Sequence, residues 1–115
     1  MSRMKYVLML CSDASVPVER FDEGVRAGCG GWTEELERRG ILHLAAGLRP
    51  ASDATTVKVR DGDVLFTDGP FAETKDQIGG VTLIECADLD EALALAASHP
   101  WAQVGQIEVR PVLAP

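Results

Sequence analysis

The chain contains few histidines, few aromatic residues and no long apolar run. Its 115 residues include two histidines, one tyrosine and two tryptophans, and aromatic residues make up 5% of the total. No window stays apolar over the ~20 residues that a membrane-spanning helix needs, so we expect no membrane association and a soluble protein. The length fits one domain over residues 1–115.

Cysteine is also scarce. Cys11, Cys29 and Cys86 are an odd number without close spacing, and neither histidine lies near them in the sequence. This pattern indicates no disulfide framework and no metal site, and we expect neither a metal nor a cofactor. We predict reduced thiols in a cytoplasmic protein, with Cys11 and Cys86 as small core residues at strand ends. A nucleophilic cysteine is the alternative.

Positive charge is in short supply as well. Eleven Lys and Arg residues face eighteen Asp and Glu residues, giving a formal net charge of −7. Direct nucleic-acid binding, which depends on cations placed against phosphates, is therefore disfavoured. Near the N-terminus, Arg3 and Lys5 precede the apolar run "YVLMLC", which is shorter than the ~7–15 residues of a signal-peptide core. A buried strand explains this run better.

Hydrophobic periodicity predicts the order strand, helix, strand, hairpin, strand, helix, strand. In the first helix, Phe21, Val25, Gly28, Trp32 and Leu36 share one face, and Gly40 ends the helix. The Asp61-Gly62 pair predicts a tight hairpin turn. The predicted strands and hairpin cover residues 5–11, 41–48, 55–67, 80–86 and 105–112.

The second helix has its own start and stop signals. Asp88 is the predicted N-cap, with Glu91 three residues on, and Pro100 ends the helix. The expected buried stripe consists of Leu89, Ala92, Leu93 and Ala96.

Three glycines interrupt the first helix within "AGCGGW", at Gly28, Gly30 and Gly31. Each costs ~1 kcal/mol relative to Ala in a helix, so a compensating feature is expected. The structural interpretation is a close approach of the helix to the sheet, or a kink. A phosphate-cradling loop is the alternative, although such loops lie at a helix N-terminus and this cluster lies in the middle.

These elements predict a ferredoxin-like α+β sandwich with a β-hairpin inserted at its middle. Its antiparallel sheet carries two helices on one face, while residues 41–48 are apolar in both phases. Leu42, Leu44 and Ala46 are expected on one face, and His43 and Ala45 on the other. We therefore predict a homodimer in which two sheets pack together, similar to the dimeric α+β barrels, with a cleft between them.

One segment is specific enough to suggest a family. The chain contains "DGPFAETKDQIGG", then "LIECADLDEALALAA", and closes on "IEVRPV". In this order the motifs resemble the bacterial YCII-related family, in particular its branch with an Asp-Gly-Pro-Phe (DGPF) signature. The resemblance implies a dimeric ferredoxin-like fold.

The resemblance also implies a site that this chain does not reproduce. In the broader family, a histidine on the first helix and an aspartate before a proline after the second helix are a proposed catalytic dyad. Here no histidine lies between Val18 and Gly40, and His99 precedes Pro100. At a helix C-terminus, His99 fits a favourable interaction with the helix dipole.

Candidate chemistry therefore falls first to the loop after the hairpin. Asp68 and Glu73 flank the Gly-Pro turn, and two close carboxylates can act as acid and base. Lys75 could pair with either, or bind an anionic ligand. The alternatives are a turn-fixing hydrogen bond for Asp68 and a solvated surface for Glu73 and Lys75. Phe71 is expected to anchor the loop.

His43 is the remaining candidate, because its strand phase places it on the face assigned to the dimer cleft. An imidazole there could transfer protons, or it could be a satisfied interface residue. The same face could carry four further side chains, of which Glu108 and Arg110 could instead form ion pairs across the dimer. These four are Tyr6, Glu85, Glu108 and Arg110.

Two function classes follow. The first is an enzyme or binding protein for a small molecule, with its site in the dimer cleft and the loop from Asp68 to Lys75 at the rim. The second is a non-catalytic accessory module with a transcription-associated protein partner, because this branch of the family is often encoded beside alternative sigma factors. A metal-dependent oxygenase, as on related dimeric barrels, would need more than two histidines.

Overall fold

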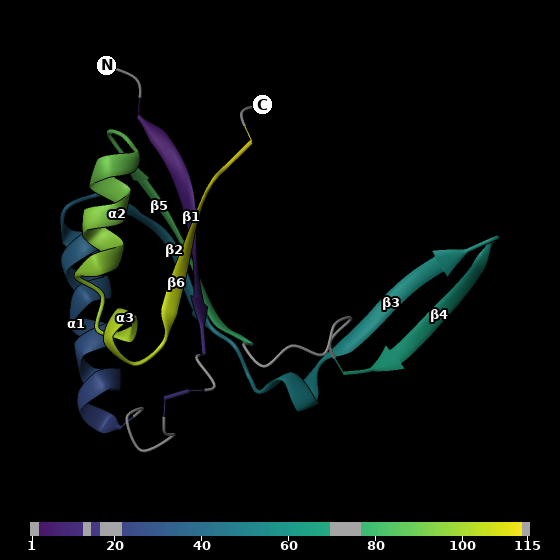
Figure 1. Cartoon of the computed structure of the whole chain (residues 1–115). Coiled ribbons are helices and arrows are strands. Elements are labelled where there is room, and N and C mark those ends of the chain that lie inside the picture. The colour runs from purple at the N-terminus through teal and green to yellow at the C-terminus, as the bar shows by residue number, and fades with distance from the viewer. Residues whose placement is uncertain (1–2, 13–14, 17–21, 70–76, 114–115) are drawn as a thin grey trace.

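The computed structural model describes residues 3–12, 15–16, 22–69 and 77–113. Ten helices and strands follow one another along these residues (Figure 1). They are β1 (Met4–Cys11), α1 (Glu23–Arg38), β2 (Leu42–Gly47), η2 (Ala51–Asp53), β3 (Thr55–Arg60), β4 (Asp63–Asp68), β5 (Ile78–Cys86), α2 (Leu89–Ala97), α3 (Trp101–Val104) and β6 (Gln106–Pro111).

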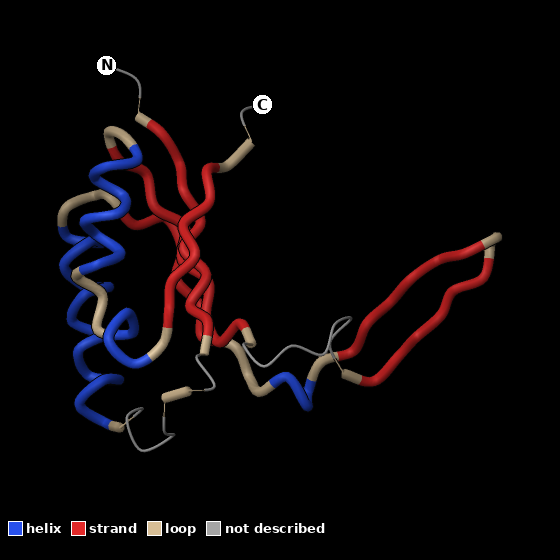
Figure 2. The backbone as a smooth tube through the Cα atoms, in the orientation of Figure 1, coloured by secondary structure: helices blue, strands red, loops and turns tan. Residues whose placement is uncertain are grey.

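The main sheet has four strands in the order β2-β5-β1-β6, and every pair is antiparallel. The helices α1, α2 and α3 cover one face, and the other face is open (Figure 2). The strands β3 and β4 form a separate two-stranded sheet inserted between β2 and β5. The predicted ferredoxin-like sandwich with an inserted hairpin is therefore confirmed.

The first helix begins and ends at sequence signals. The Asp22 carboxylate accepts a hydrogen bond from the backbone N–H of Val25, which caps the N-terminus. Gly40 follows the helix with a φ of 73°, a conformation that favours glycine. Trp32 and Leu36 are buried against the sheet, as their spacing predicts. Phe21, expected on the same stripe, lies outside the described residues.

The second helix is shorter than predicted and turns a different face to the core. The N-cap prediction is confirmed, because the Asp88 carboxylate accepts from the Glu91 N–H. Leu89 and Leu93 are 45% and 47% exposed, so the predicted stripe is wrong at these two positions. In a run of alternating Ala and Leu, several adjacent stripes are apolar, and periodicity alone does not select among them. The buried stripe is Ala92, Leu95 and Ala96.

The core lies between the helices and the covered face of the sheet. Leu8 of β1 and Ile84 and Cys86 of β5 are completely buried in it, and Tyr6 of β1 is 2% exposed. Tyr6 therefore does not lie on the open face, and its assignment to the dimer cleft is wrong. No helix in the described part of the chain is long and apolar enough to span a bilayer.

An irregularity in β2 changes the expected side-chain phase. Leu42 is paired with Ile84, whereas Leu44 is already paired with Leu83, so the register shifts at His43. Such a bulge rotates the following side chains to the opposite face. Leu42 accordingly packs on the core, while Leu44 shares the open face with Leu83. The predicted common face for Leu42, Leu44 and Ala46 is wrong for this reason.

The predicted hairpin is confirmed. Asp61 and Gly62 both have positive φ, 51° and 82°, as a two-residue turn of type I′ requires. The paired strands β3 and β4 project from the body of the molecule, on the side of the sheet away from the helices (Figure 1). We call this hairpin, residues 55–68, the arm.

Candidate functional site

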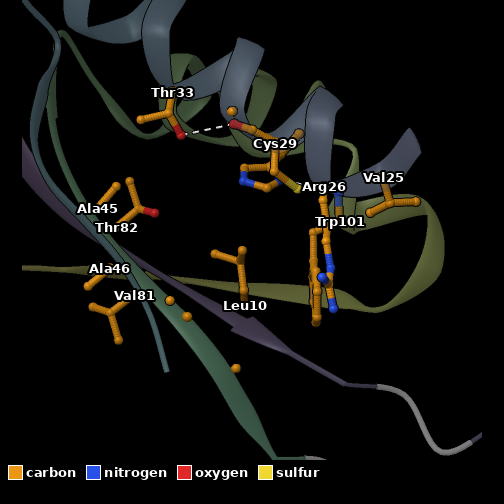
Figure 3. Close-up of a pocket in the computed structure, with 15 residues that line it drawn as sticks. Leu10, Val25, Arg26, Cys29, Thr33, Ala45, Ala46, Val81, Thr82 and Trp101 are labelled. Carbon is orange, nitrogen blue, oxygen red and sulfur yellow. Dashed lines mark hydrogen bonds between the residues drawn. The ribbon is translucent and has the colours of Figure 1, made fainter. Parts of the chain in front are cut away.

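A cavity of about 550 Å³ lies between α1 and the covered face of the sheet (Figure 3). Its walls come from α1, β2 and β5, from Leu10 at the end of β1, and from the segment that follows α2. The lining residues are Leu10, Val25, Arg26, Cys29, Gly30, Thr33, Ala45, Ala46, Gly47, Gly79, Gly80, Val81, Thr82, His99 and Trp101.

Small residues create this space. A Cβ atom built on Gly30 of α1 or Gly47 of β2 would meet no atom within 4 Å, so neither glycine is required by a neighbouring contact. Gly28, by contrast, would place a Cβ 2.9 Å from Cγ of Pro100. The predicted close approach in the glycine cluster is therefore real only at Gly28, and its partner is Pro100 rather than the sheet. Gly30 instead opens the cavity wall.

His99 forms the buried polar end of the cavity. It is 2% exposed, and its Nδ1 accepts a hydrogen bond of 3.0 Å from the backbone N–H of Trp101. An Nδ1 that accepts assigns the proton of the neutral ring to Nε2. The ring centroid of Trp32 lies 4.4 Å from that of His99, and the Trp32 indole is fixed by donating to the Leu95 carbonyl at 3.0 Å.

Burial lowers the pKa of His99 to about 4. The cation would lose its hydration in this apolar surrounding, so the neutral ring is favoured. At neutral pH the side chain therefore carries no charge to interact with a helix dipole, and that expectation for His99 is wrong. A neutral imidazole with its proton on Nε2 can donate one hydrogen bond to a bound molecule.

Cys29 lies beside this histidine. Its Sγ is 3.9 Å from His99 Nδ1, and the two residues are 70 positions apart in the chain. Burial raises the pKa of the Cys29 thiol, while a hydrogen bond from the Trp101 backbone opposes part of that shift. The thiol thus stays protonated at neutral pH, which favours a small polar lining group over a nucleophile.

Two hydrogen bonds fix Trp101, one from its indole and one from its backbone. Its indole Nε1 donates to the Cys11 carbonyl at 2.9 Å, and its backbone donates to His99. A Cβ atom on Gly105 would lie 2.5 Å from that same carbonyl oxygen and 2.6 Å from the indole nitrogen. Glycine at position 105 is thus required for α3 to dock against the end of β1. This docking places the Trp101 ring in the cavity wall.

Among the described residues that line the cavity, Arg26 is the only cation. It lies one helical turn before Cys29, and Figure 3 shows it next to Trp101 at one end of the cavity. No ion pair among the described side chains involves its guanidinium. A cation beside an apolar wall is suited to a carboxylate, sulfonate or phosphate group.

Asp68 and His43, the two predicted site residues that the structure describes, lie outside the cavity. Asp68 ends β4 on the arm and is exposed. Glu73 and Lys75, like Phe71, lie outside the described residues, so the cluster of Asp68, Glu73 and Lys75 stays a prediction. Gly79 is the extra residue in β5 where the pairing with β1 shifts, so β5 has a bulge at the double glycine.

His43 is on the open face, not in the cavity. Its Nε2 lies 2.7 Å from Oε1 of Glu85, and both side chains are partly exposed. The hydrogen bond from His43 is the main reason that the pKa of Glu85 is lowered. Glu108 and Arg110 form a second ion pair on the neighbouring β6. Three of the four further cleft residues named from the sequence thus share the open face: Glu85, Glu108 and Arg110.

Sequence reasoning missed Arg26, Cys29 and Trp101, and it gave His99 a different role. A signal was present, because Arg26, Cys29, Gly30 and Thr33 recur at spacings of three, one and three on α1. The face of α1 that carries these four residues has mixed polarity, so a search for apolar periodicity does not detect it. Within the described residues, no group of three His, Cys, Asp or Glu side chains could hold a metal ion.

Comparison with known proteins matches almost the whole chain to one family. The model of the YCII-related domain matches residues 4–114. "Uncharacterized protein R00369" of Rhizobium meliloti (strain 1021) is 37% identical over 114 residues, which span 95% of this chain and 92% of that protein. In this chain His99 stands before Pro100, where the resemblance implied an aspartate, and the first helix brings Cys29 to it. The chain belongs to the YCII-related family.

Proposed function

We propose that this protein binds a small, largely apolar molecule that carries an anionic group, in the cavity between α1 and the sheet. The observation that supports the proposal is a cavity of about 550 Å³ with an apolar wall and a few convergent polar groups. This volume lies within the ~300–1,000 Å³ typical of small-molecule sites. The cleft at a dimer interface, expected from the sequence, stays a separate prediction.

Each polar group in the wall suits one part of such a molecule. Arg26 supplies the only positive charge of the described lining and would pair with the anionic group. His99, neutral and fixed by Trp101, would donate from Nε2 to a carbonyl or hydroxyl oxygen. The small residues of β2 and β5 would pack on the apolar body.

The arrangement favours binding over covalent catalysis. A protonated thiol and a neutral imidazole lie side by side, and the environment raises the pKa of one and lowers that of the other. An activated thiolate–imidazolium pair needs the opposite shifts. The accessory-module alternative stays a prediction.

Two glycines of α1 provide a matched test with 1-anilinonaphthalene-8-sulfonate, an apolar probe with an anionic sulfonate. Gly30 lines the cavity, whereas Gly31 does not, and a Cβ on either would meet no atom within 4 Å. Gly30→Leu should fill the cavity and weaken probe binding at least ~10-fold, and Gly31→Leu should bind like wild type. Equal binding by all three proteins would contradict the proposal.

The role of Arg26 requires a charge-matched control. Arg26→Gln should weaken binding of the sulfonate probe, but not of uncharged N-phenyl-1-naphthylamine, because only the sulfonate needs a cation. Arg39→Gln removes the same charge from the exposed end of α1 and should affect neither probe. Loss of both probes in Arg26→Gln would show that the arginine shapes the cavity without recognising charge.

A further inference from the structure

Two polar side chains are buried in the part of the chain that the structure describes, and both line the cavity beneath α1. Thr82 of β5 is 4% exposed and His99 is 2% exposed. The His99 ring has a partner, because its Nδ1 accepts from the Trp101 N–H. The Thr82 hydroxyl forms no hydrogen bond with any described residue. A buried polar group without a partner is rare in native proteins and requires an explanation.

The Thr82 hydroxyl opens onto the cavity. Within the described residues, every side-chain nitrogen or oxygen that is sealed from solvent has a hydrogen-bond partner. The unpartnered Thr82 oxygen is therefore not sealed, and Figure 3 shows it on the side of β5 that faces the cavity. Ala45, which is paired with Thr82 across β2 and β5, ends at its Cβ atom and has no group that could bond to the hydroxyl. The hydroxyl is thus available to a bound molecule.

Packing does not require a hydroxyl at position 82. Every second residue of β5 from Gly80 to Cys86 is buried, and the other members of this column are apolar. Valine has nearly the same shape as threonine and suits a strand equally well, so it would fill the position without burying a polar group. Threonine here costs stability that valine would not, which is typical of a residue that serves binding.

A second threonine in the cavity wall provides a comparison. The Thr33 hydroxyl of α1 donates to the Cys29 carbonyl, one helical turn earlier, at 2.9 Å (Figure 3). This bond within the helix accounts for the Thr33 hydroxyl without any ligand. Thr82 and Thr33 therefore have the same side chain and line the same cavity, but only the Thr82 hydroxyl lacks a partner among the described residues.

Thr82 and Arg26 lie at opposite ends of the cavity (Figure 3). A sphere of 550 Å³ is about 10 Å across, so one small molecule could reach both ends. The labelled neighbours of Thr82 in the wall include Ala45, Ala46 and Val81, and none of them is charged. A charged group at this end would lose its hydration without an opposite charge to compensate, so the group bound there is uncharged.

We propose that the ligand is polar at both ends: its anionic group lies at Arg26, and an uncharged hydroxyl or carbonyl group at its other end bonds to Thr82. This inference rests on the proposed function, because it places a second group of the same ligand. A threonine hydroxyl both donates and accepts hydrogen bonds, so it suits either group. The ligand class is therefore a hydroxy- or oxo-substituted apolar acid, in preference to an unsubstituted one.

Calorimetric titration with two acids of matched size tests this class. In 6-hydroxy-2-naphthoate a hydroxyl lies opposite the carboxylate, and in 6-methyl-2-naphthoate a methyl group of similar size takes its place. The wild type should bind the hydroxy acid ~10-fold more tightly, because the methyl acid leaves the Thr82 hydroxyl buried and unpaired. Equal affinity for both acids would overturn this inference and leave the proposed cavity site intact. Binding of neither acid would overturn both proposals.

Variants of the two threonines assign the preference to one hydroxyl. Thr82→Val should reduce the preference for the hydroxy acid at least ~5-fold and bind the methyl acid as well as wild type does. Thr82→Ser, which retains the hydroxyl, should keep the preference. Thr33→Val should also keep it, because that hydroxyl is bonded within α1. An equal reduction in Thr82→Val and Thr33→Val would contradict the assignment.

The melting temperature separates a binding role of Thr82 from a structural one. Without ligand, Thr82→Val should melt about 3 °C above wild type, because the variant no longer buries an unpaired hydroxyl. If the hydroxyl instead stabilised the fold, Thr82→Val would melt below wild type and lose both acids together. That result would overturn the inference.

Discussion

The two faces of the central sheet use the same strands for different purposes. On the covered face, β5 presents the buried Thr82 to the helices, and Thr82 and a buried, neutral His99 both line the cavity. On the open face, the next residue along, Leu83, lies near the exposed pair of His43 and Glu85. The chain's two histidines thus occupy opposite environments. Burial and the small residues of the wall, not the mere presence of an imidazole, distinguish the face that can enclose a ligand.

Of the substitutions considered, Gly105→Ala should have the largest effect, because it disrupts the packing of the covered face. The new Cβ would lie 2.5 Å from the Cys11 carbonyl oxygen, so α3 could no longer dock on the covered face. We expect a loss of about 3 kcal/mol in the free energy of unfolding, measured by urea titration. Gly31→Ala, where the Cβ meets nothing, should be neutral or stabilising by up to ~1 kcal/mol. Equal stability of the two variants would contradict the docking.

The buried His99 predicts that the stability of the fold depends on pH. The unfolded chain protonates His99 near pH 6.5, and the folded chain only near pH 4, so the unfolded state binds more protons between these values. His99 therefore contributes full stability above this window, and the contribution falls as the pH drops through it. From pH 8 to pH 5 the wild type should lose about 2 kcal/mol through this residue.

The variant His99→Asn isolates the contribution of His99 to this pH dependence, because asparagine retains an acceptor for the Trp101 N–H and does not titrate. Urea unfolding at pH 8 and pH 5 should show a smaller loss for the variant than for the wild type. A loss of the same size in both proteins would assign the pH dependence to other groups.

The smallest effect is expected on the open face. Glu85→Gln removes one partner of an exposed ion pair, and such pairs contribute little because water and salt screen them. We expect a change in unfolding free energy within the error of a urea titration, and unchanged binding of the sulfonate probe. A marked loss of probe binding would contradict the cavity site and indicate a site on the open face, where the sequence analysis expects the cleft.

The fold could be predicted from local signals, and the candidate site could not. Asp61-Gly62, Asp88 and the spacing of Trp32 and Leu36 each act within a few residues, and all are confirmed. The cavity depends on contacts between distant segments, such as Cys29 with His99, 70 positions away. The bulge at His43 also reversed the face of the following residues, and strand alternation alone gives no sign of it.

The central claim is that the covered face, beneath α1, holds the ligand site. Its most direct test is a ¹H–¹⁵N NMR titration of the wild type with 1-anilinonaphthalene-8-sulfonate. We predict that the amide signals of Gly30, Gly47 and Gly80, which border the cavity, shift in a saturable manner, and that those of Leu83 and Val57 do not. Shifts confined to Leu83, Val57 and their neighbours would contradict the account.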